Sequence, residues 1–375
     1  YGAVTLNAFG KRFLADPGQA VSMPDCHSQI LVNGAGRVRN TVPVPMLKGI
    51  SSDKLTDTVD VDFTDAFRMG FFGAPGTSGI PCGRAGIESG KRQVIQVRGA
   101  GDIPTYYIIH DSVLTGQPAV SGQLFVTDQG MRLTQEENGA LRIEEAVGEE
   151  YGYSPSGKAQ ASWRIQVPAD GLYYLHIYAK TVANVWLSVD GQKEKPFRFA
   201  QPPSRPNTWQ WRPILQNKEL LCLTLTRGEH TIAVKTSSQF CTLALSTEKL
   251  LLGEMPETDK GILLKFEKAE KTGDWKTLRP SKDALLVIPM ETPEKTEMDI
   301  LRFTTRFHGQ LPVAMPRFSF NKSGKKTSFV SLLFPLKDGS QPPKIQGRIV
   351  SFPQAEDTVQ ITEGKVSVTR KIQAP

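Results

Sequence analysis

Short alternating apolar runs, each closed by a turn signal, constrain the fold of this chain more than any other feature. Runs such as VTLNAF (4–9), TVDVDF (58–63) and SWRIQV (162–167) carry apolar residues at alternate positions, the period of a half-buried β-strand. The 33 glycines and 26 prolines separate such runs along the whole chain. No window of helical length keeps a 3.6-residue period, so the sequence predicts an all-β protein.

The turn signals also predict a domain organisation. Asp-Gly at 170–171 and 190–191 and Gly228 mark three hairpin turns between strands in the middle of the chain. We therefore expect residues 149–252 to form a small jelly-roll β-sandwich. Residues 1–148 and 253–375 would be the two parts of a larger, supersandwich-like antiparallel β-sandwich that the small one interrupts. Because the first residues already have a strand pattern, we expect the chain to be part of a longer protein.

Charge is unevenly spread within the net value of +7. Residues 1–150 have 13 Lys and Arg against 17 Asp and Glu, residues 151–253 have 12 against 6, and residues 254–375 have 20 against 15. Basic middle and final segments indicate an anionic partner. No nucleic-acid-binding motif accompanies the basic residues, which favours an acidic polysaccharide over nucleic acid. No apolar run is long enough to predict a membrane span.

The four cysteines lack the CxxC spacing of metal ribbons and redox sites. Cys222 and Cys241 leave two alternatives open, a disulfide between neighbouring strands or two thiols, of which burial as thiols is the commoner.

Two histidines are candidates for function. His27, in DCHSQILVNGAG (25–36), precedes a strand that ends at Asn33-Gly34; it is either a site residue or a turn histidine. His110 and Asp111 are adjacent in an apolar strand, so their side chains point to opposite faces. We expect Asp111 inside, bonded to backbone or to an arginine, and His110 outward.

Several segments occur in the order seen in one enzyme family. The chain resembles the C-terminal β-sandwich region of heparinase II/III-like polysaccharide lyases through Asp16-Pro17-Gly18, His27-Ser28, Asn33-Gly34, the basic strand Arg92–Arg98, the aromatic strand Tyr106–Asp111 and the late strand KKTSFVSLLFPL (325–336). The middle segment resembles galactose-binding-like jelly rolls of the carbohydrate-binding type, a fold that hosts many ligands.

The lyase resemblance implies β-elimination on an acidic, uronate-containing glycan. It implies an upstream α/α-toroid domain that carries most of the catalytic groups, so that this chain alone is inactive, and export by a bacterium to the periplasm or the medium. The alternative is a non-catalytic carbohydrate-binding or interaction module.

In the resemblance, His27 corresponds to the motif histidine, either catalytic or a ligand of a structural divalent metal (zinc or calcium). Two departures weaken the metal site: Gln29 replaces the usual Thr, and TVPVPM (41–46) lacks the expected second ligand, an Asp. Nearby acidic residues that would have to substitute are Asp53, Asp57, Asp60 and Asp62.

Basic and aromatic residues supply candidate glycan contacts. Arg84 and Arg92 lie at a long Gly-rich stretch (71–92) and would meet sulfate or carboxylate groups. In RPNTWQWRP (205–213) the candidates are Arg205, Trp209, Trp211 and Arg212. The two tryptophans either face outward as a sugar-stacking platform or belong to the sandwich core, and the core is favoured. FNKSGKKTS (320–328) has the pattern of a basic hairpin tip.

Overall fold

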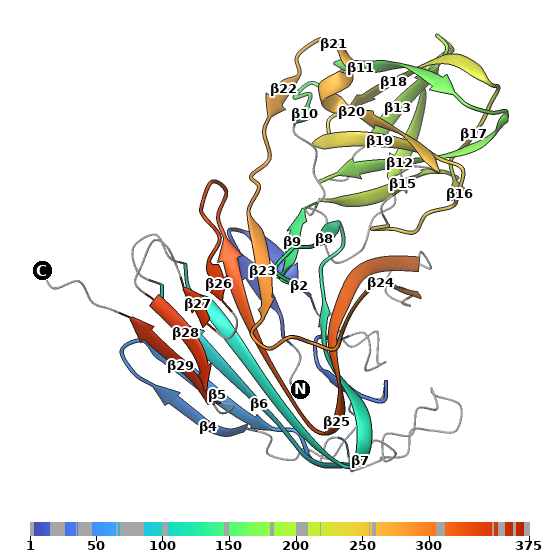
Figure 1. The fold of residues 1–375 in the computed structure, drawn as a ribbon. Helices are drawn as coiled ribbons and strands as arrows, with labels where there is room; N and C mark the ends of the chain where they lie inside the picture. The colour runs from blue at the N-terminus through green and yellow to red at the C-terminus, as the bar shows by residue number, and fades with distance from the viewer. Residues whose placement is uncertain are drawn as a thin grey trace, which may run out of the picture.

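The chain folds into two large antiparallel β-sheet assemblies, as Figure 1 shows. The all-β prediction is confirmed: the described elements are β-strands, with a short 3₁₀-helix, η3 (Phe266–Lys268). The computed structural model describes residues 4–15, 27–34, 36, 47–64, 67, 86–99, 104–145, 150–180, 184–199, 209–217, 219–254, 256, 260–304, 312–346, 349–351, 357–362 and 365–370.

One sheet of ten strands combines segments from both ends of the chain. Its main path runs β4-β5-β6-β7-β25-β23-β9-β8, with β3 added to β7 and β24 added to β25. The strands are β3 (Ile30–Val32), β4 (Leu47–Ser52), β5 (Thr56–Asp62), β6 (Ile87–Val97), β7 (Tyr106–Val126), β8 (Met131–Gln135), β9 (Leu141–Glu145), β23 (Ala284–Pro289), β24 (Lys295–Thr304) and β25 (Pro312–Leu336).

Two long central strands give this sheet its strong curl, which Figure 1 shows. β7 has 21 residues and β25 has 25, and they pair along almost their whole length. At the corner the register shifts, since Gly324 opposes Ala119 whereas Lys326 opposes Leu114. Residues 320–328 are therefore the bend of a continuous strand, and the predicted hairpin tip is wrong.

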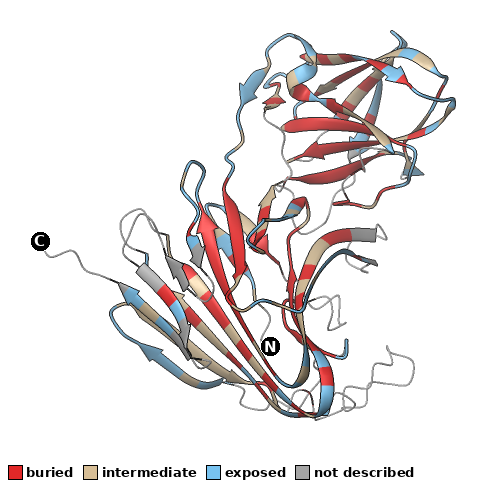
Figure 2. Ribbon diagram, viewed as in Figure 1, coloured by how far each residue is buried: buried red, intermediate tan, exposed pale blue. Residues whose placement is uncertain are grey.

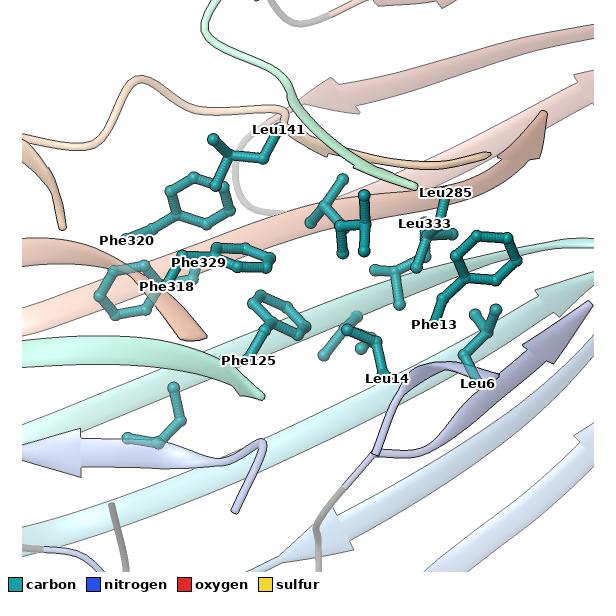
Figure 3. Packing of buried hydrophobic residues seen from close by; sticks show 14 of the residues in the cluster. Leu6, Phe13, Leu14, Phe125, Leu141, Leu285, Phe318, Phe320, Phe329 and Leu333 are labelled. Carbon is teal, nitrogen blue, oxygen red and sulfur yellow. The ribbon is translucent and has the colours of Figure 1, made fainter. Parts of the chain in front are cut away.

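Both faces of the curled sheet are buried over part of its area. On β7, Tyr107 and Ile109 belong to the core of one face, whereas Tyr106 and Ile108 belong to the core of the other. The first core, part of which Figure 3 shows, receives Phe13 and Leu14 from the hairpin of β1 (Leu6–Ala8) and β2 (Lys11–Leu14). The second core includes Val359, from a separate four-stranded sheet of β26 (Lys344–Gln346), β27 (Ile349–Ser351), β28 (Asp357–Thr362) and β29 (Lys365–Arg370).

The middle of the chain supplies the second assembly, of 13 strands. Its inward positions form a separate core that includes Trp163, Ile177, Val234 and Phe240. Strand pairing extends past the predicted end at 252, to Leu278. The strands are β10 (Tyr151–Tyr153), β11 (Gln160–Val167), β12 (Gly171–Ala179), β13 (Asn184–Val189), β14 (Lys195–Phe199), β15 (Gln210–Gln216), β16 (Glu219–Leu220), β17 (Cys222–Leu225), β18 (Gly228–Thr236), β19 (Phe240–Ser246), β20 (Gly261–Lys265), β21 (Glu270–Thr272) and β22 (Lys276–Leu278).

No disulfide joins Cys222 and Cys241; both are thiols. Cys222 lies on β17 and Cys241 on β19, and β12 pairs with both of these strands. The intervening strand separates the two sulfur atoms, so the disulfide alternative is wrong. Cys26 and Cys82 lie outside the described residues.

Backbone and side-chain contacts join the two assemblies. The hydroxyl of Tyr178 on β12 donates to the carbonyl of Gly130, in the turn between β7 and β8, at 2.9 Å. The amide of Gly253 donates to the carbonyl of Trp211 at 2.8 Å, and the amide of Ala314 on β25 donates to the carbonyl of Leu252 at 2.9 Å. Figure 2 shows that buried residues line the strands of both assemblies.

Candidate functional site

A buried ion pair lies at the centre of the candidate site. The Arg92 guanidinium on β6 binds the Asp111 carboxylate on β7 through Nε–Oδ1 at 2.7 Å and Nη2–Oδ2 at 2.8 Å. The exposed fractions of the residues are 4% and 0%. The register of the sheet places the two residues directly opposite each other. The prediction of an inward Asp111 bonded to an arginine is confirmed.

Two further polar side chains complete this pair. Gln123 Nε2 donates to Asp111 Oδ2 at 2.6 Å, and Ser331 Oγ on β25 donates to Gln123 Oε1 at 2.5 Å. Gln123 and Ser331 are both buried. The Asp111 carboxylate thus accepts three side-chain hydrogen bonds, which compensate for its loss of hydration.

The segment that carries His27 docks onto this network. Arg92 Nη1 donates to the Ser28 carbonyl at 3.4 Å, and the Val126 amide donates to Ser28 Oγ at 2.9 Å. The carbonyl of Gln29 accepts from the Leu124 amide at 2.8 Å. Ser28 is buried, whereas His27 is half-buried in the bend that precedes β3. His27 therefore lies at the rim of a fixed, buried polar network.

The turn after β3 has the conformation that its sequence demands. Asn33 and Gly34 have φ values of 49° and 73°, the left-handed region that Asn and Gly tolerate best. The Asn33 amide donates to the Val120 carbonyl at 2.7 Å, and Asn33 Oδ1 accepts from the Val120 amide at 3.0 Å. Both ends of the short strand β3 are thus tied to the second half of β7.

His110 lies on the opposite face of β7 from Asp111. Its Nε2 is 3.1 Å from Ser328 Oγ on β25. Burial lowers the pKa of His110, although the nearby charges of Asp111 and Glu291 act in the opposite direction. Burial thus favours the neutral form of His110, and its ring contacts Ser328 across the sheet.

The two candidate tryptophans lie inside the molecule. The exposed fractions of Trp209 and Trp211 are 6% and 4%. The Trp209 ring stacks on Tyr178, with centroids 5.6 Å apart and planes at 13°, and the Trp211 ring lies 5.4 Å from the same tyrosine. This burial matches the core alternative. A substrate-binding role for Trp209 and Trp211 stays a prediction, and both side chains are buried in this structure.

Two of the arginines predicted to contact a glycan, Arg92 and Arg212, are also buried. Arg212 is fully buried, and its guanidinium donates to the carbonyls of Ala179 at 3.2 Å and Lys180 at 3.3 Å. Burial lowers the pKa of Arg212 to about 10. The Arg92 guanidinium is bound to the Asp111 carboxylate. A glycan-binding role for Arg92 and Arg212 stays a prediction. Arg84 and Arg205 lie outside the described residues.

The acidic residues considered as metal ligands have other partners. Asp53 Oδ1 accepts from the amides of Leu55 and Thr56 at 2.7 and 2.6 Å, and these hydrogen bonds lower its pKa. Asp57 binds Ser52 and Arg98, and Asp60 accepts from Gln93. Among the described residues, no group of three or more His, Cys, Asp or Glu side chains could hold a metal ion. A structural zinc or calcium ion at His27 stays a prediction.

Two members of the network, Gln123 and Ser331, were not predicted from the sequence, and Ser28 was named only as part of the His27-Ser28 motif. Ser28, Gln123 and Ser331 are ordinary polar residues whose partners are distant in the sequence. Strand parity was an available signal, since Gln123 is two residues from the core residue Phe125, and Ser331 is two residues from Phe329 and Leu333. A polar residue at a core parity position requires a buried partner.

Fold and site together define an antiparallel β-sandwich protein with a buried polar network that binds Ser28, the residue after the half-buried His27. No helix in the described part of the chain is long and apolar enough to cross a membrane. No family model and no curated protein matches the sequence.

Along almost its whole length, this chain is similar to part of two solved structures of one enzyme. They are heparan sulfate lyase HepC from Pedobacter heparinus and a mutant of it, with 10% and 9% sequence identity and a TM-score of 0.42 for each. Each alignment covers 99% of this chain and 36% of the lyase chain, so this chain spans about a third of the length of those proteins. At that similarity the likeness says nothing about activity in this chain.

Proposed function

We propose that this chain is the β-sandwich portion of a polysaccharide lyase that cleaves an acidic, uronate-containing glycan by β-elimination. The proposal rests on one observation: the motif segments that resemble the heparinase II/III-like lyases lie close together in the fold. His27-Ser28, Asn33-Gly34, Arg92 and Asp111 are separated in the sequence, yet they meet along one strand, β7.

The chemistry sets the role of each group. Removal of the C5 proton of a uronate requires a base within hydrogen-bond reach and positive or hydrogen-bonding groups on the carboxylate. His27 is half-buried and suits either task. The charged groups of the buried network, Arg92 and Asp111, already neutralise each other. The remaining catalytic groups would come from an upstream α/α-toroid domain, as the sequence resemblance implies.

An ultraviolet assay of the full-length protein tests this proposal. Incubation with heparin, chondroitin, hyaluronan, alginate or ulvan should produce the absorbance of an unsaturated uronate with one of these glycans. His27→Ala should lower that rate while the circular dichroism spectrum stays unchanged. Absence of product with all five glycans, together with measurable glycan binding by calorimetry, would establish the non-catalytic binding module instead. An unchanged rate in His27→Ala would remove His27 from the site.

We also propose that the full-length protein is bacterial and is exported to the periplasm or the medium. A lyase for an acidic glycan meets its substrate outside the cytoplasm, in the periplasm or the medium. Fractionation of the source cells, with the full-length protein detected by antibody, tests this placement. A purely cytoplasmic protein would contradict it.

A further inference from the structure

The buried network donates a hydrogen bond to the segment that carries His27, from Arg92 to the Ser28 carbonyl. We propose that Arg92, Asp111 and Gln123 are positioning residues, which hold the Ser28 peptide and thereby fix His27 where a substrate would meet it. The inference rests on the proposed function for the role of His27, but the positioning itself does not depend on which glycan is cleaved.

Stability alone does not account for this ion pair. A buried ion pair is expensive to desolvate, and well-packed apolar residues of similar volume usually replace it with little loss or even a gain of stability. Apart from its polar partners, the pair lies among apolar side chains, since Ile109, Val113 and Phe329 of the same core lie beside Asp111 on β7 and β25. Stability alone therefore gives little reason for an ionic pair at this position, and we look for its role in the hydrogen bonds that it directs.

What the ionic pair supplies is a directed donor. Asp111 holds Arg92 through Nε and Nη2, and this fixes the plane of the guanidinium. Nη1 is then directed at the Ser28 carbonyl. Gln123 binds Asp111 from the second half of β7, so the carboxylate is fixed from two sides.

Ser28, which accepts the hydrogen bond from Arg92, is also held by other segments of the chain. The Ser28 carbonyl also accepts from the Val4 amide at 3.2 Å, and its hydroxyl is bound to the Val126 amide. His27 immediately precedes this residue. Any rotation of the Ser28 peptide would break hydrogen bonds to three different segments, so the network restricts the backbone that carries the imidazole.

A double variant separates positioning from stability. Arg92→Met/Asp111→Leu replaces the pair by apolar side chains and removes the donor to Ser28. The matched control is Arg317→Met/Asp299→Leu, because Arg317 and Asp299 form a bidentate pair of the same geometry, at 2.6 and 2.8 Å, with Asp299 exposed on β24.

The first measurement needs no activity. The chain has five histidines, so a His27→Gln spectrum assigns the His27 ring protons by NMR. At one fixed pH, these protons should shift in the Arg92/Asp111 variant and stay in place in the Arg317/Asp299 variant, with the circular dichroism of both unchanged. Unshifted His27 protons in a folded Arg92/Asp111 variant would overturn the proposal. If that variant does not fold, Arg92→Lys, which keeps a positive charge beside Asp111 but removes the planar guanidinium that donates to Ser28, is measured in the same way and decides by the same criterion.

The second measurement uses the full-length protein and its active glycan. We expect kcat of the Arg92/Asp111 variant to fall about 10- to 100-fold with KM within about twofold, as expected for a misplaced catalytic group. Shifted His27 protons with no activity even in the wild-type protein would refute the lyase function but not the positioning. Full activity of the variant in an active wild-type background would refute the positioning.

Discussion

Gln123 and Asp111 lie on the same strand, 12 residues apart, and their side chains are joined by a hydrogen bond of 2.6 Å. In a straight strand, 12 residues would separate them by about 40 Å. The bond is possible because β7 curls through its corner, so that its two halves face each other. This side-chain contact braces the curl, and Arg92 and Ser331 extend the brace to β6 and β25.

The brace predicts a large effect of Asp111→Asn. The change leaves Arg92 buried with a neutral partner, and the free energy of unfolding should fall by about 3–5 kcal/mol. Asp299→Asn breaks the similar but exposed pair with Arg317 and should cost less than about 1 kcal/mol. Urea unfolding followed by circular dichroism measures both. Similar losses for the two variants would show that the brace contributes no more than a surface pair.

The curl also explains what the sequence could and could not predict. Alternation identified the strands and placed Asp111 inside, because parity is a local property. It did not reveal that TYYIIHDSVL and GQLFVT form one strand, since Gly116 and Pro118 between them are typical turn residues. Continuity there depends on pairing with β25, more than 190 residues away. The burial of Arg92 and Arg212 was missed for the same reason: their partners are distant in the sequence.

The junction between the two assemblies predicts a contrast between two glycines. Gly130 and Gly139 both have positive φ, +77° and +80°, so alanine at either site incurs about 1–2 kcal/mol of backbone strain. At Gly139 a Cβ would meet nothing within 4 Å, whereas at Gly130 it would lie 2.4 Å from the Trp209 carbonyl oxygen.

Gly130→Ala should therefore destabilise the protein by about 1–3 kcal/mol more than Gly139→Ala does. Thermal unfolding followed by tryptophan fluorescence reports on the change, because Trp209 and Trp211 lie at this junction. Equal melting temperatures for the two variants would mean that the backbone around Trp209 moves to accommodate the added methyl group with no loss of stability.

The positions of the cysteines predict their chemistry. Cys222 is partly exposed and Cys241 is buried. With no reductant present, iodoacetamide should modify Cys222 in the folded protein and Cys241 after unfolding, as peptide mass spectrometry would show. A Cys222–Cys241 cross-linked peptide in the non-reduced digest would contradict the arrangement of β17 and β19 on either side of β12.

His176 predicts a loss of stability in mild acid. It lies on β12 with an exposed fraction of 1%, and neither ring nitrogen has a hydrogen-bond partner among the described residues. Burial lowers its pKa from 6.5 to about 4. Between these values the unfolded chain binds a proton that the folded chain does not. Stability is therefore complete above about pH 6.5, and it falls by up to about 3 kcal/mol as the pH drops to 4.

His176→Phe should remove this part of the pH dependence. Urea unfolding at pH 7 and pH 5 measures the difference, and the phenylalanine variant should lose less stability than the wild type between the two values. His230→Gln is the control, because Asp190 and the Thr226 carbonyl raise the pKa of His230. A raised folded-state pKa adds stability at low pH, so this control should lose at least as much as the wild type. The same loss in His176→Phe as in the wild type would assign the acid sensitivity to other groups.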